Sequence, residues 1–392
     1  MKSSNLVINK PGVPLVSILT SVYNGEAYIA NCIESILGQT FQDFEFVIVD
    51  DGSTDGTWEI IQKFAVEDRR IAAVQCLTNQ GVVAGLNRGL SKTRGQYIAR
   101  QDADDMSRPE RLAKQVDFLN THREYGVVAC QVTYIDSANR PVNQASTFNT
   151  IDNAEIQQKL LEYMCLCGPS IMMRRQSVEA AGFWFGEGLD ASEDYDLCLR
   201  LSEVTKLFNL PEPLYMYRLH AQSASIKQEY KQIVHKATAL ENAVRRRGKN
   251  HIDRAALATL GKDYLKAAVL AYTNKDAEAT REAMVKATEA DPFILENSDL
   301  IERVIRYRMP DEVDLAIPFV CAFFTTFLPQ SPELKRLNSR LISEIHMKEV
   351  FVGAQLRERK RVKLHLWEGL RLDPRWLKNR GVLMIALKYG LI

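Results

Sequence analysis

The sequence predicts an α/β domain with a mostly parallel sheet flanked by helices, followed by an all-α C-terminal domain. Between residues 15 and 100, short apolar runs alternate four times with segments of helical spacing. This alternation is typical of parallel strands joined by right-handed crossover helices. From Tyr230 to Ile392, strand-like runs are absent and Ala, Leu, Lys, Arg and Glu recur at helical spacing. A chain of 392 residues is long enough for both parts.

The composition is that of an ordinary globular protein. Hydrophobic residues make up 46% and charged residues 25% of the chain, and the net charge of +1 gives no argument for a nucleic-acid partner. Seven scattered cysteines favour a reducing compartment over a disulfide framework or a zinc site. Residues 1–14 lack the apolar core of a signal peptide, and the longest apolar run, 315–328, is too short to span a membrane. We therefore expect a cytoplasmic protein.

Each predicted strand of the first domain is a short apolar run that ends at polar or small residues. Strands are expected at 15–21, 44–49, 71–75 and 97–100, and helices at 27–37, 58–64 and 81–90. Tyr23, Asn24 and Gly25 form a turn signal after the first strand, and Thr54 or Asp55 is suited to cap the second helix. The carboxyl ends of these strands should meet at one edge of the sheet, where open α/β sheets bind ligands.

The most unusual stretch is the acidic segment Asp102-Ala103-Asp104-Asp105, which begins two residues after the end of the fourth strand. Crowded carboxylates repel one another, and a buried cluster is costly unless a cation neutralises it. Hard divalent ions such as Mg²⁺ or Mn²⁺ take oxygen ligands, so this segment is a candidate metal site. The alternative is a solvated turn that caps a helix starting near Pro109.

Polar side chains also follow the first two strands. Tyr23 offers a flat ring on which a nucleotide base can stack, Asp51 can accept a hydrogen bond from a base N–H group, and Asp102 can accept from ribose hydroxyls. A half-buried turn tyrosine is the alternative for Tyr23 alone, but three such strand ends together favour a ligand site. The glycine-rich turn of a dinucleotide-binding fold is missing, because the first turn has only Gly25, and no triphosphate-binding loop occurs.

These motifs, in this order and spacing, resemble those of the family 2 glycosyltransferases, which are inverting nucleotide-sugar enzymes with the GT-A fold. The resemblance covers roughly residues 14–226. It rests on the segments 15–24, 50–55, 79–81 with Asn87, 102–105, 109–112, 168–170 with Gly182, 193–196 and 217–220. It implies transfer of a sugar from a nucleoside diphosphate sugar, with Mn²⁺ or Mg²⁺ as cofactor.

The resemblance also implies which residues hold the donor. Ser21, Tyr23 and Asp51 would hold the base, and Asp102 the ribose. The full set implied in nucleotide-sugar binding is Ser21, Tyr23, Asn24, Asp51, Asn79, Asp102 and Arg218.

A metal site is implied by the same resemblance. Asp104 would bind the metal that bridges the two phosphates, and His220 would complete the site. Arg218 beside it could meet a phosphate oxygen. Without the resemblance, His220 would be interpreted as a surface histidine after a strand at 213–219.

A second acidic site is formed by Glu193 and Asp194. Taken alone, it could be the solvated N-terminus of a helix. Transfer with inversion, however, needs one general base to take the proton from the attacking hydroxyl. Asp194 is the candidate base, and Glu193 is a neighbour that can orient the acceptor. At Gly168 many relatives carry His or a similar polar residue, which puts an acceptor contact from this position in doubt.

The C-terminal part reads as helices. Residues 264–292 resemble a single tetratricopeptide-like hairpin with a turn at 274–276, without a clean repeat. Residues 357–380 hold nine Lys or Arg against three Asp or Glu, interleaved with Leu and Trp. This stretch fits a peripheral membrane contact or a protein partner, although a packed helix with a solvated basic face is the preferred interpretation. The expected domains are a tail at 1–13, a glycosyltransferase domain at 14–226 and a helical domain at 227–392.

Taken together, we expect a glycosyltransferase of polysaccharide biosynthesis that uses a UDP- or dTDP-sugar. Its acceptor would be a glycan or a lipid-linked glycan, met in the cytoplasm or on the inner face of the membrane. The alternative is an inactive nucleotide-sugar-binding scaffold acting through the helical domain, against which intact Asp104, Asp194 and His220 argue. A nucleotidyltransferase is disfavoured, because no basic, glycine-rich triphosphate loop occurs near the first strand.

Overall fold

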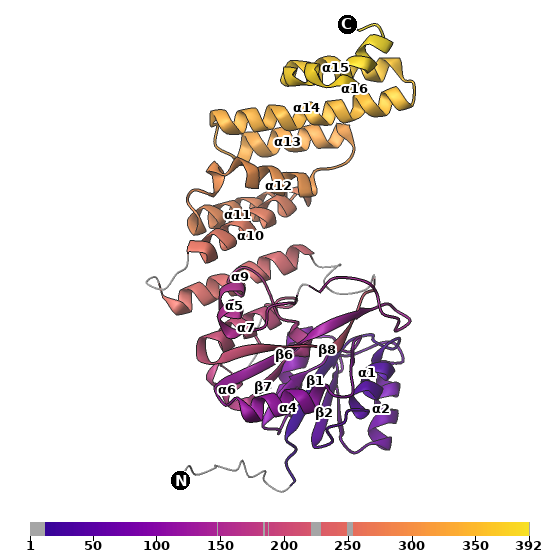
Figure 1. Cartoon of the computed structure of the whole chain (residues 1–392), viewed down its shortest axis with the longest axis vertical. Coiled ribbons are helices and arrows are strands. Elements are labelled where there is room, and N and C mark those ends of the chain that lie inside the picture. Colours follow the sequence, from indigo (N-terminus) through magenta and orange to yellow (C-terminus); the bar gives the residue numbers. More distant parts are fainter. Residues whose placement is uncertain are drawn as a thin grey trace. The chain divides into compact units, whose positions relative to one another are not determined.

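The computed structural model describes residues 12–146, 148–182, 185–186, 188–220, 229–248 and 254–391. The chain divides into two compact units, Met1–Ala256 and Leu257–Ile392 (Figure 1). The first unit is a mixed sheet with flanking helices and the second is helical, which confirms the predicted fold class. Residues 1–11 of the predicted tail and the predicted boundary between residues 226 and 227 lie outside the described residues.

The sheet of the first unit has the described strands in the order β3-β2-β1-β4-β7-β6-β8-β5. The strands are β1 (Val16–Val22), β2 (Phe44–Asp50), β3 (Ile71–Gln75), β4 (Tyr97–Arg100), β5 (Met106–Ser107), β6 (Tyr125–Ile135), β7 (Met172–Arg174) and β8 (Lys206–Arg218). β3, β2, β1 and β4 run parallel, as predicted, whereas β7 is antiparallel to both β4 and β6. β8 is parallel to β6, and β5 pairs antiparallel with β8.

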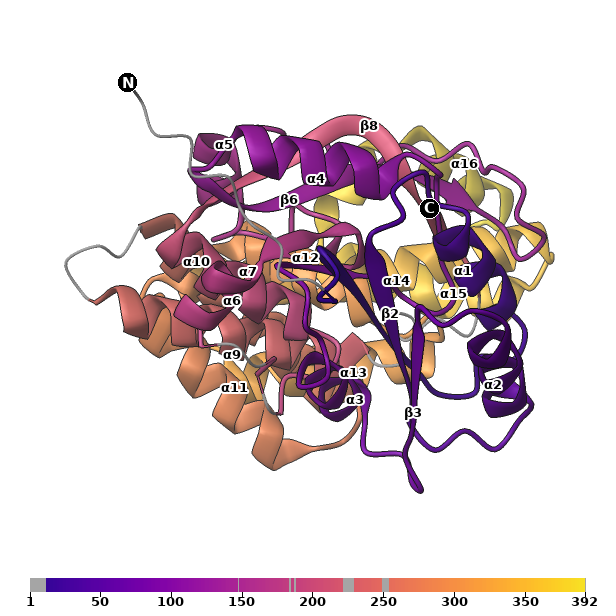
Figure 2. The same ribbon diagram turned by 90° about the horizontal axis from the view of Figure 1, so that it is seen from below.

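Helices pack on both faces of the parallel half of the sheet (Figure 2). The described helices of this unit are α1 (Ile29–Leu37), α2 (Thr57–Glu67), α3 (Val82–Leu90), α4 (Arg111–Thr121), α5 (Asn153–Lys159), α6 (Arg175–Ala180), α7 (Glu193–Val204) and α9 (Glu229–Arg247). On one face, Ile33 of α1 and Leu112 of α4 share a core with Ile18 of β1. On the other face, α3 lies close to β1 because Gly89 has no side chain; a Cβ there would lie 2.3 Å from Leu19 Cδ1.

The register of the parallel strands brings the predicted site to one edge of the sheet. Val22 of β1 pairs with Asp50 of β2, and Leu19 of β1 pairs with Arg100 of β4. The loops that begin at residues 23, 51 and 101 therefore leave the sheet side by side. This is the carboxyl edge, where open α/β sheets bind their ligands.

The second unit is a stack of helices. They are α10 (Arg254–Thr273), α11 (Ala277–Ala290), α12 (Ser298–Arg308), α13 (Val313–Phe327), α14 (Pro332–Gln355), α15 (Arg359–Leu372) and α16 (Arg380–Lys388). α10 and α11 form the predicted hairpin: Lys275 in its turn has a positive φ of 61°, and Asp276 caps α11 by accepting from Ala279 N. Among the described residues, no helix is both long and apolar enough to cross a bilayer.

Candidate active site

Asp51 lies directly after β2 and is almost fully buried. Its Oδ2 accepts hydrogen bonds from the backbone N–H groups of Gln80, at 3.0 Å, and Gly81, at 2.8 Å. Its Oδ1 is buried with no hydrogen-bond partner among the described residues. A buried acceptor without a partner is costly in a native protein. This oxygen is therefore suited to a donor group of a ligand, such as a base N–H.

The other predicted donor-binding side chains lie around the same loops. Asn24, with a φ of 52°, accepts from Thr54 N at 2.8 Å and so ties the loop after β1 to the loop after β2. Asn79 Oδ1 accepts from the backbone N–H of Gly81 at 3.1 Å. Both asparagines shape the loops, while the Tyr23 ring is about half exposed (49%) and accessible to a ligand.

Ser21, near the end of β1, is half-buried beside α3. A Cβ added to Gly85 of α3 would lie 2.1 Å from Ser21 Oγ. The Ser21 hydroxyl therefore occupies space that is open only because residue 85 has no side chain.

Three carboxylates gather after β4. Asp102, Asp104 and Asp105 each offer an oxygen, and these oxygens lie within 4.8 Å of one another. Burial raises the pKa of Asp102, and the charge of Asp104 raises it further, against the lowering effect of Arg100. Burial and the same neighbouring carboxylates raise the pKa of Asp105 well above its usual range. Oxygen ligands crowded to this degree fit a hard divalent cation.

Two residues at and just after the end of β8 contact this cluster. His220 Nε2 lies 2.9 Å from Asp104 Oδ2, and its Nδ1 is buried without a described partner. Arg218 is also buried; its Nε donates to the carbonyl of Asp104 at 2.6 Å, and its backbone N–H donates to Asp105 Oδ1 at 2.7 Å. One guanidinium nitrogen of Arg218 has no described partner. The structure thus brings His220 and Arg218 to the acidic cluster, 113 to 116 positions away in sequence.

Glu193 and Asp194 occupy the first turn of α7. Glu193 is buried, whereas Asp194 is half-buried and its Oδ1 accepts from Tyr195 N at 2.7 Å. Burial and the charge of Glu193 raise the pKa of Asp194 to about 6, although Arg100 opposes this shift. Gly168 lies against Asp194, because a Cβ there would lie only 2.0 Å from Asp194 Oδ2.

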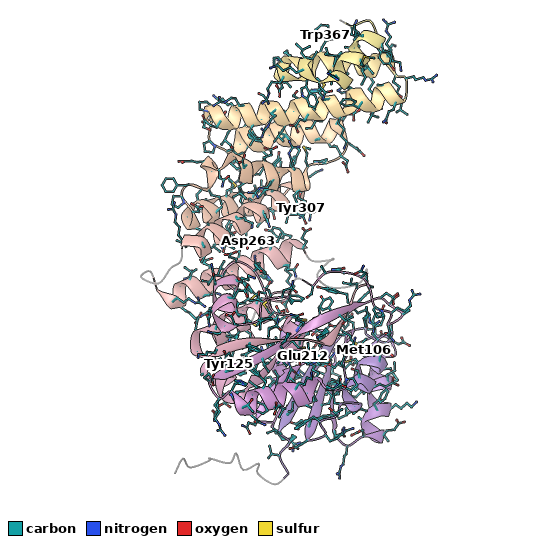
Figure 3. The ribbon with its side chains drawn as sticks, viewed as in Figure 1. Met106, Tyr125, Glu212, Asp263, Tyr307 and Trp367 are labelled. Atoms are coloured by element: carbon teal, nitrogen blue, oxygen red, sulfur yellow. The ribbon has the colours of Figure 1, made fainter. Side chains whose placement is uncertain are left out.

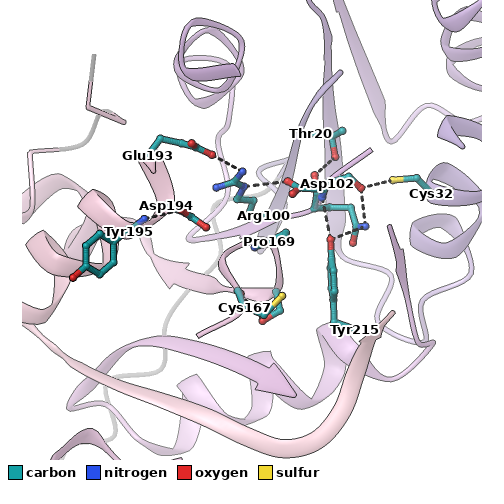
Figure 4. Close-up of polar contacts among 12 residues, drawn as sticks. Thr20, Cys32, Arg100, Asp102, Cys167, Pro169, Glu193, Asp194, Tyr195 and Tyr215 are labelled. Carbon is teal, nitrogen blue, oxygen red and sulfur yellow. Dashed lines mark hydrogen bonds and ion pairs between the residues drawn. The ribbon is translucent and has the colours of Figure 1, made fainter. Parts of the chain in front are cut away.

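Arg100 joins the two acidic sites (Figure 4). Its Nε donates to Asp102 Oδ1 at 3.2 Å and its NH2 donates to Glu193 Oε1 at 2.7 Å. The side chain is buried, with about 6% of its surface exposed, at the end of β4. The prediction from sequence missed Arg100. The available signal was its position at the end of β4, two residues before the acidic segment.

Arg111, at the start of α4, is a second buried arginine; it lies in the motif segment 109–112, but no role in the site was predicted for it from the sequence. Its NH2 donates to the carbonyl of Arg100 at 2.7 Å and to the carbonyl of Pro169 at 3.2 Å. Its NH1 donates to Gln101 Oε1 at 2.9 Å. Arg111 thereby fixes the end of β4 against the turn that contains Gly168.

Residues 17–182 match the family model described as glycosyl transferase family 2. A Bacillus subtilis protein named as the glycosyltransferase EpsE is 38% identical over 208 residues, which cover 52% of this chain and 73% of that protein. The chain belongs to glycosyltransferase family 2. The chondroitin synthase of Escherichia coli is 32% identical over 216 residues, covering 55% of this chain and 30% of that protein.

Solved structures show the same fold. Residues 1–349 of Staphylococcus aureus TarS, in complex with UDP, match with a TM-score of 0.55 and 20% identity, covering 85% of this chain and 91% of that one. The mannosyltransferase PcManGT from Pyrobaculum calidifontis, in complex with GDP-Man and Mn²⁺, matches with a TM-score of 0.50 and 14% identity, covering 94% and 89%. The first unit of this family 2 glycosyltransferase is therefore a GT-A fold.

In this glycosyltransferase, the residues expected from the sequence gather in one region. The acidic cluster carries His220 and Arg218 on one side, and Arg100 links it to the start of α7 on the other. The described residues there offer a buried carboxylate oxygen without a described partner on Asp51, a cluster of three carboxylates, and the half-buried carboxylate of Asp194.

Proposed function

We propose that this enzyme transfers a sugar, with inversion, from a nucleoside diphosphate sugar to a hydroxyl group of a glycan or lipid-linked glycan. The observation that carries the proposal is the chain Asp102–Arg100–Glu193, which sets the acidic cluster beside the half-buried Asp194. Donor and acceptor groups must meet at one point for direct displacement, and this geometry supports such a meeting.

The donor proposed is a uridine or thymidine diphosphate sugar. Asp51 Oδ1, buried without a partner, would accept from the N–H of a pyrimidine base, and the Tyr23 ring would stack on it. Asp102 would accept from the ribose. The solved complex of TarS with UDP supports this choice, whereas PcManGT binds GDP-Man. Uridine and guanosine diphosphate are therefore the pair that the binding experiment must distinguish.

The metal proposed is Mn²⁺ or Mg²⁺. Asp104 and His220 would hold it, next to the carboxylates of Asp102 and Asp105. The buried, unpartnered His220 Nδ1 and the crowded oxygens fit such an ion, and PcManGT was solved with Mn²⁺. When bound, a divalent ion stabilises the negative charge of a departing diphosphate. Arg218, with a free guanidinium nitrogen, would add positive charge on the same side.

Asp194 would be the general base. With a pKa of about 6, most of its carboxylate is ionised at neutral pH and yet basic enough to take a proton. The acceptor oxygen would bond to the anomeric carbon as its proton moves to Asp194, while the diphosphate leaves from the opposite face. Glu193, fixed by Arg100, would orient the acceptor.

Two observations support the proposed acceptor class and compartment. Relatives include chondroitin synthases of Escherichia coli and Pasteurella multocida, which supports a role in polysaccharide biosynthesis. All seven cysteines are free, and six are buried, which supports a reducing compartment such as the cytoplasm.

The decisive experiment is calorimetric titration of UDP, dTDP and GDP and of their sugars, with and without Mn²⁺. We expect metal-dependent binding of a pyrimidine nucleotide, weakened at least about 100-fold in Asp104→Ala. The matched control is Asp117→Ala, on the exposed side of α4, which should bind as the wild type does. Asp194→Asn should keep the binding but lose about 10²- to 10⁴-fold in transfer.

Two results would contradict the proposal. If no nucleotide binds in the presence of Mn²⁺, the donor site is wrong. If nucleotide binds but no acceptor or water is ever glycosylated, the alternative of an inactive nucleotide-sugar-binding scaffold is favoured.

A further inference from the structure

The outer side of α15 combines apolar and basic side chains. Leu364 and Trp367 are 64% and 52% exposed. Lys360, Lys363 and Arg371 are also exposed and follow the same spacing of three and four residues. Residues at this spacing share one face of a helix. We call these five residues the C-terminal basic face.

The opposite side of α15 packs against neighbouring helices of the second unit. Val362, Leu366 and Leu370 share a hydrophobic core with Val350 of α14 and Val382 of α16. Within this unit, Figure 1 shows α14 between α13 and α15, and Figure 3 shows Trp367 on α15 at the end of the stack. The terminal helices of a stacked array, here α15 and α16, ordinarily present a polar outer surface to water. On α15 that surface carries a leucine and a tryptophan.

The charge around this face is strongly positive. Residues 357–388 contain ten Lys or Arg and three Asp or Glu. Each of the three acidic side chains is paired with an arginine: Glu358 with Arg361, Glu368 with Arg371, and Asp373 with Arg375. Lys360 and Lys363 have no ion-pair partner described in residues 254–391. The surplus charge therefore faces outward, where an anionic surface could meet it.

The next helix continues the pattern. On α16, Met384 and Leu387 are 66% and 60% exposed, and Lys388 follows at the same helical spacing. Their opposite neighbours, Val382 and Ala386, belong to the core shared with α14 and α15. Two successive helices thus expose large apolar side chains next to cations.

We propose that the C-terminal basic face docks this protein on an anionic lipid bilayer. Trp367 and Leu364 would enter the headgroup region, where aromatic and aliphatic side chains are stable. Lys360, Lys363 and Arg371 would contact lipid phosphates, to which the negative surface potential of such a membrane attracts them. This inference goes beyond sugar transfer, which needs no membrane, and it favours an acceptor carried by a lipid.

The test is co-sedimentation of the full chain with vesicles. Wild type should sediment with vesicles of equal parts phosphatidylglycerol and phosphatidylcholine, but not with phosphatidylcholine alone, and high salt should weaken the binding. Lys360→Glu combined with Lys363→Glu should weaken it by about tenfold or more. Trp367→Ala should weaken it as well, because a surface helix also gains from apolar burial.

Matched controls come from the same unit. Lys335→Glu and Phe293→Ala change an exposed cation and an exposed aromatic residue outside the face, and both should bind vesicles as the wild type does. All variants should keep the metal-dependent nucleotide binding of the wild type, so a failed donor site is recognised separately from a failed membrane site.

Three outcomes would overturn the inference. One is that wild type does not sediment with anionic vesicles. Another is that the face and control variants bind equally. The third is that Trp367→Ala abolishes a concentration-dependent self-association seen without lipid, which would make the face an interface between copies of the chain.

Discussion

Asp194 differs from an ordinary surface aspartate in its environment. Burial comes first among the causes that raise its pKa to about 6, the charge of Glu193 comes next, and Arg100 acts in the opposite direction. A general base works only when it is ionised, so the proton that it binds below this pKa inhibits the reaction.

The pH profile of transfer should reflect this pKa. We expect kcat/KM to be flat above a pH of about 6 and to fall about tenfold per pH unit below it. In Glu193→Gln the like charge is removed, so the falling limb should move to lower pH. The measurement is initial rate between a pH of about 5 and about 8 at saturating Mn²⁺. An unchanged limb in Glu193→Gln would mean that another group controls the profile.

Arg100 should matter for stability and for both substrates. Removing one partner of a buried ion pair leaves the other charge unpaired, so Arg100→Met should lower the free energy of unfolding by about 3–5 kcal/mol. It should also weaken binding of nucleotide with Mn²⁺ and raise the acceptor KM, because Asp102 and Glu193 both lose a hydrogen bond. Arg100→Lys keeps the positive charge but cannot make both hydrogen bonds of the guanidinium group. Its stability, nucleotide affinity and acceptor KM should lie between those of the wild type and those of Arg100→Met.

Urea unfolding measures the stability, calorimetric titration measures the nucleotide affinity, and initial rates of transfer give the acceptor KM. The control is Arg69→Met, which changes an exposed arginine of the same unit. If nucleotide affinity and acceptor KM stay as in the wild type while only stability falls, Arg100 has a purely structural role.

At the scale of single residues, the sequence predicts where the carboxylates of the site lie better than it predicts which arginines contact the site. Asp51, Asp102 and Asp104 follow apolar strands, so their position at the ligand-binding edge could be inferred. The roles of Arg100 and Arg111 could not be inferred, because nothing near either residue in the sequence shows which distant groups its guanidinium contacts. Only the fold brings Arg100 to Glu193, 93 positions later.

At the scale of elements, the turn before β7 and the first turn of α7 are fitted to each other. Gly168 begins the short 3₁₀ segment Gly168–Ser170, and any side chain there would collide with Asp194. This explains in physical terms why a glycine occupies this position.

Gly168→Ala should therefore displace Asp194, the proposed general base. Its Cβ would lie 2.0 Å from Asp194 Oδ2 and 2.8 Å from Asp194 Cβ, so the turn or the helix must move. We expect a loss of stability of about 1–3 kcal/mol, as for other overpacked sites. Transfer should fall far more than nucleotide binding. Gly38→Ala, at the end of α1, is the control, and equal loss in both assays would contradict the prediction.

The strands of the parallel half were predictable because each is an apolar run bounded by turn residues. The second half was harder. β6 is not among the predicted strands, and β8 begins at Lys206, earlier than the strand expected at 213–219. Pro211 and Pro213 lie inside β8, where the pairing with β6 shifts register. Prolines ordinarily argue against a strand, so the sequence signal was masked.

At the scale of the whole molecule, the residues of the candidate site all belong to the first unit, Met1–Ala256. The helix α9 belongs there too: His235 Nδ1 lies 2.7 Å from the carbonyl of Asp190, and Arg246 pairs with Glu203 at 3.0 Å. The composition of α9 resembles that of the helices that follow it. Its assignment therefore depends on contacts that the sequence does not reveal.

Two compact units should unfold separately. We expect two transitions in a calorimetric scan, because chains with several domains seldom unfold in one step. UDP with Mn²⁺ should raise the midpoint temperature of the first unit's transition alone. At a ligand concentration of 100 times Kd, binding adds about 2.7 kcal/mol to the free energy of unfolding of that unit. A shift of both transitions would show that the units are energetically coupled.

The buried Arg111 also has a consequence for redesign. It holds the carbonyl oxygens of Arg100 and Pro169 with one guanidinium group, so the end of β4, next to the acidic cluster, and the turn beside Asp194 share a single anchor. A loop grafted over 167–170 to change acceptor preference would have to keep a carbonyl within reach of that anchor. Swaps that ignore it should also disturb the nucleotide end, which makes the two substrate preferences harder to engineer one at a time.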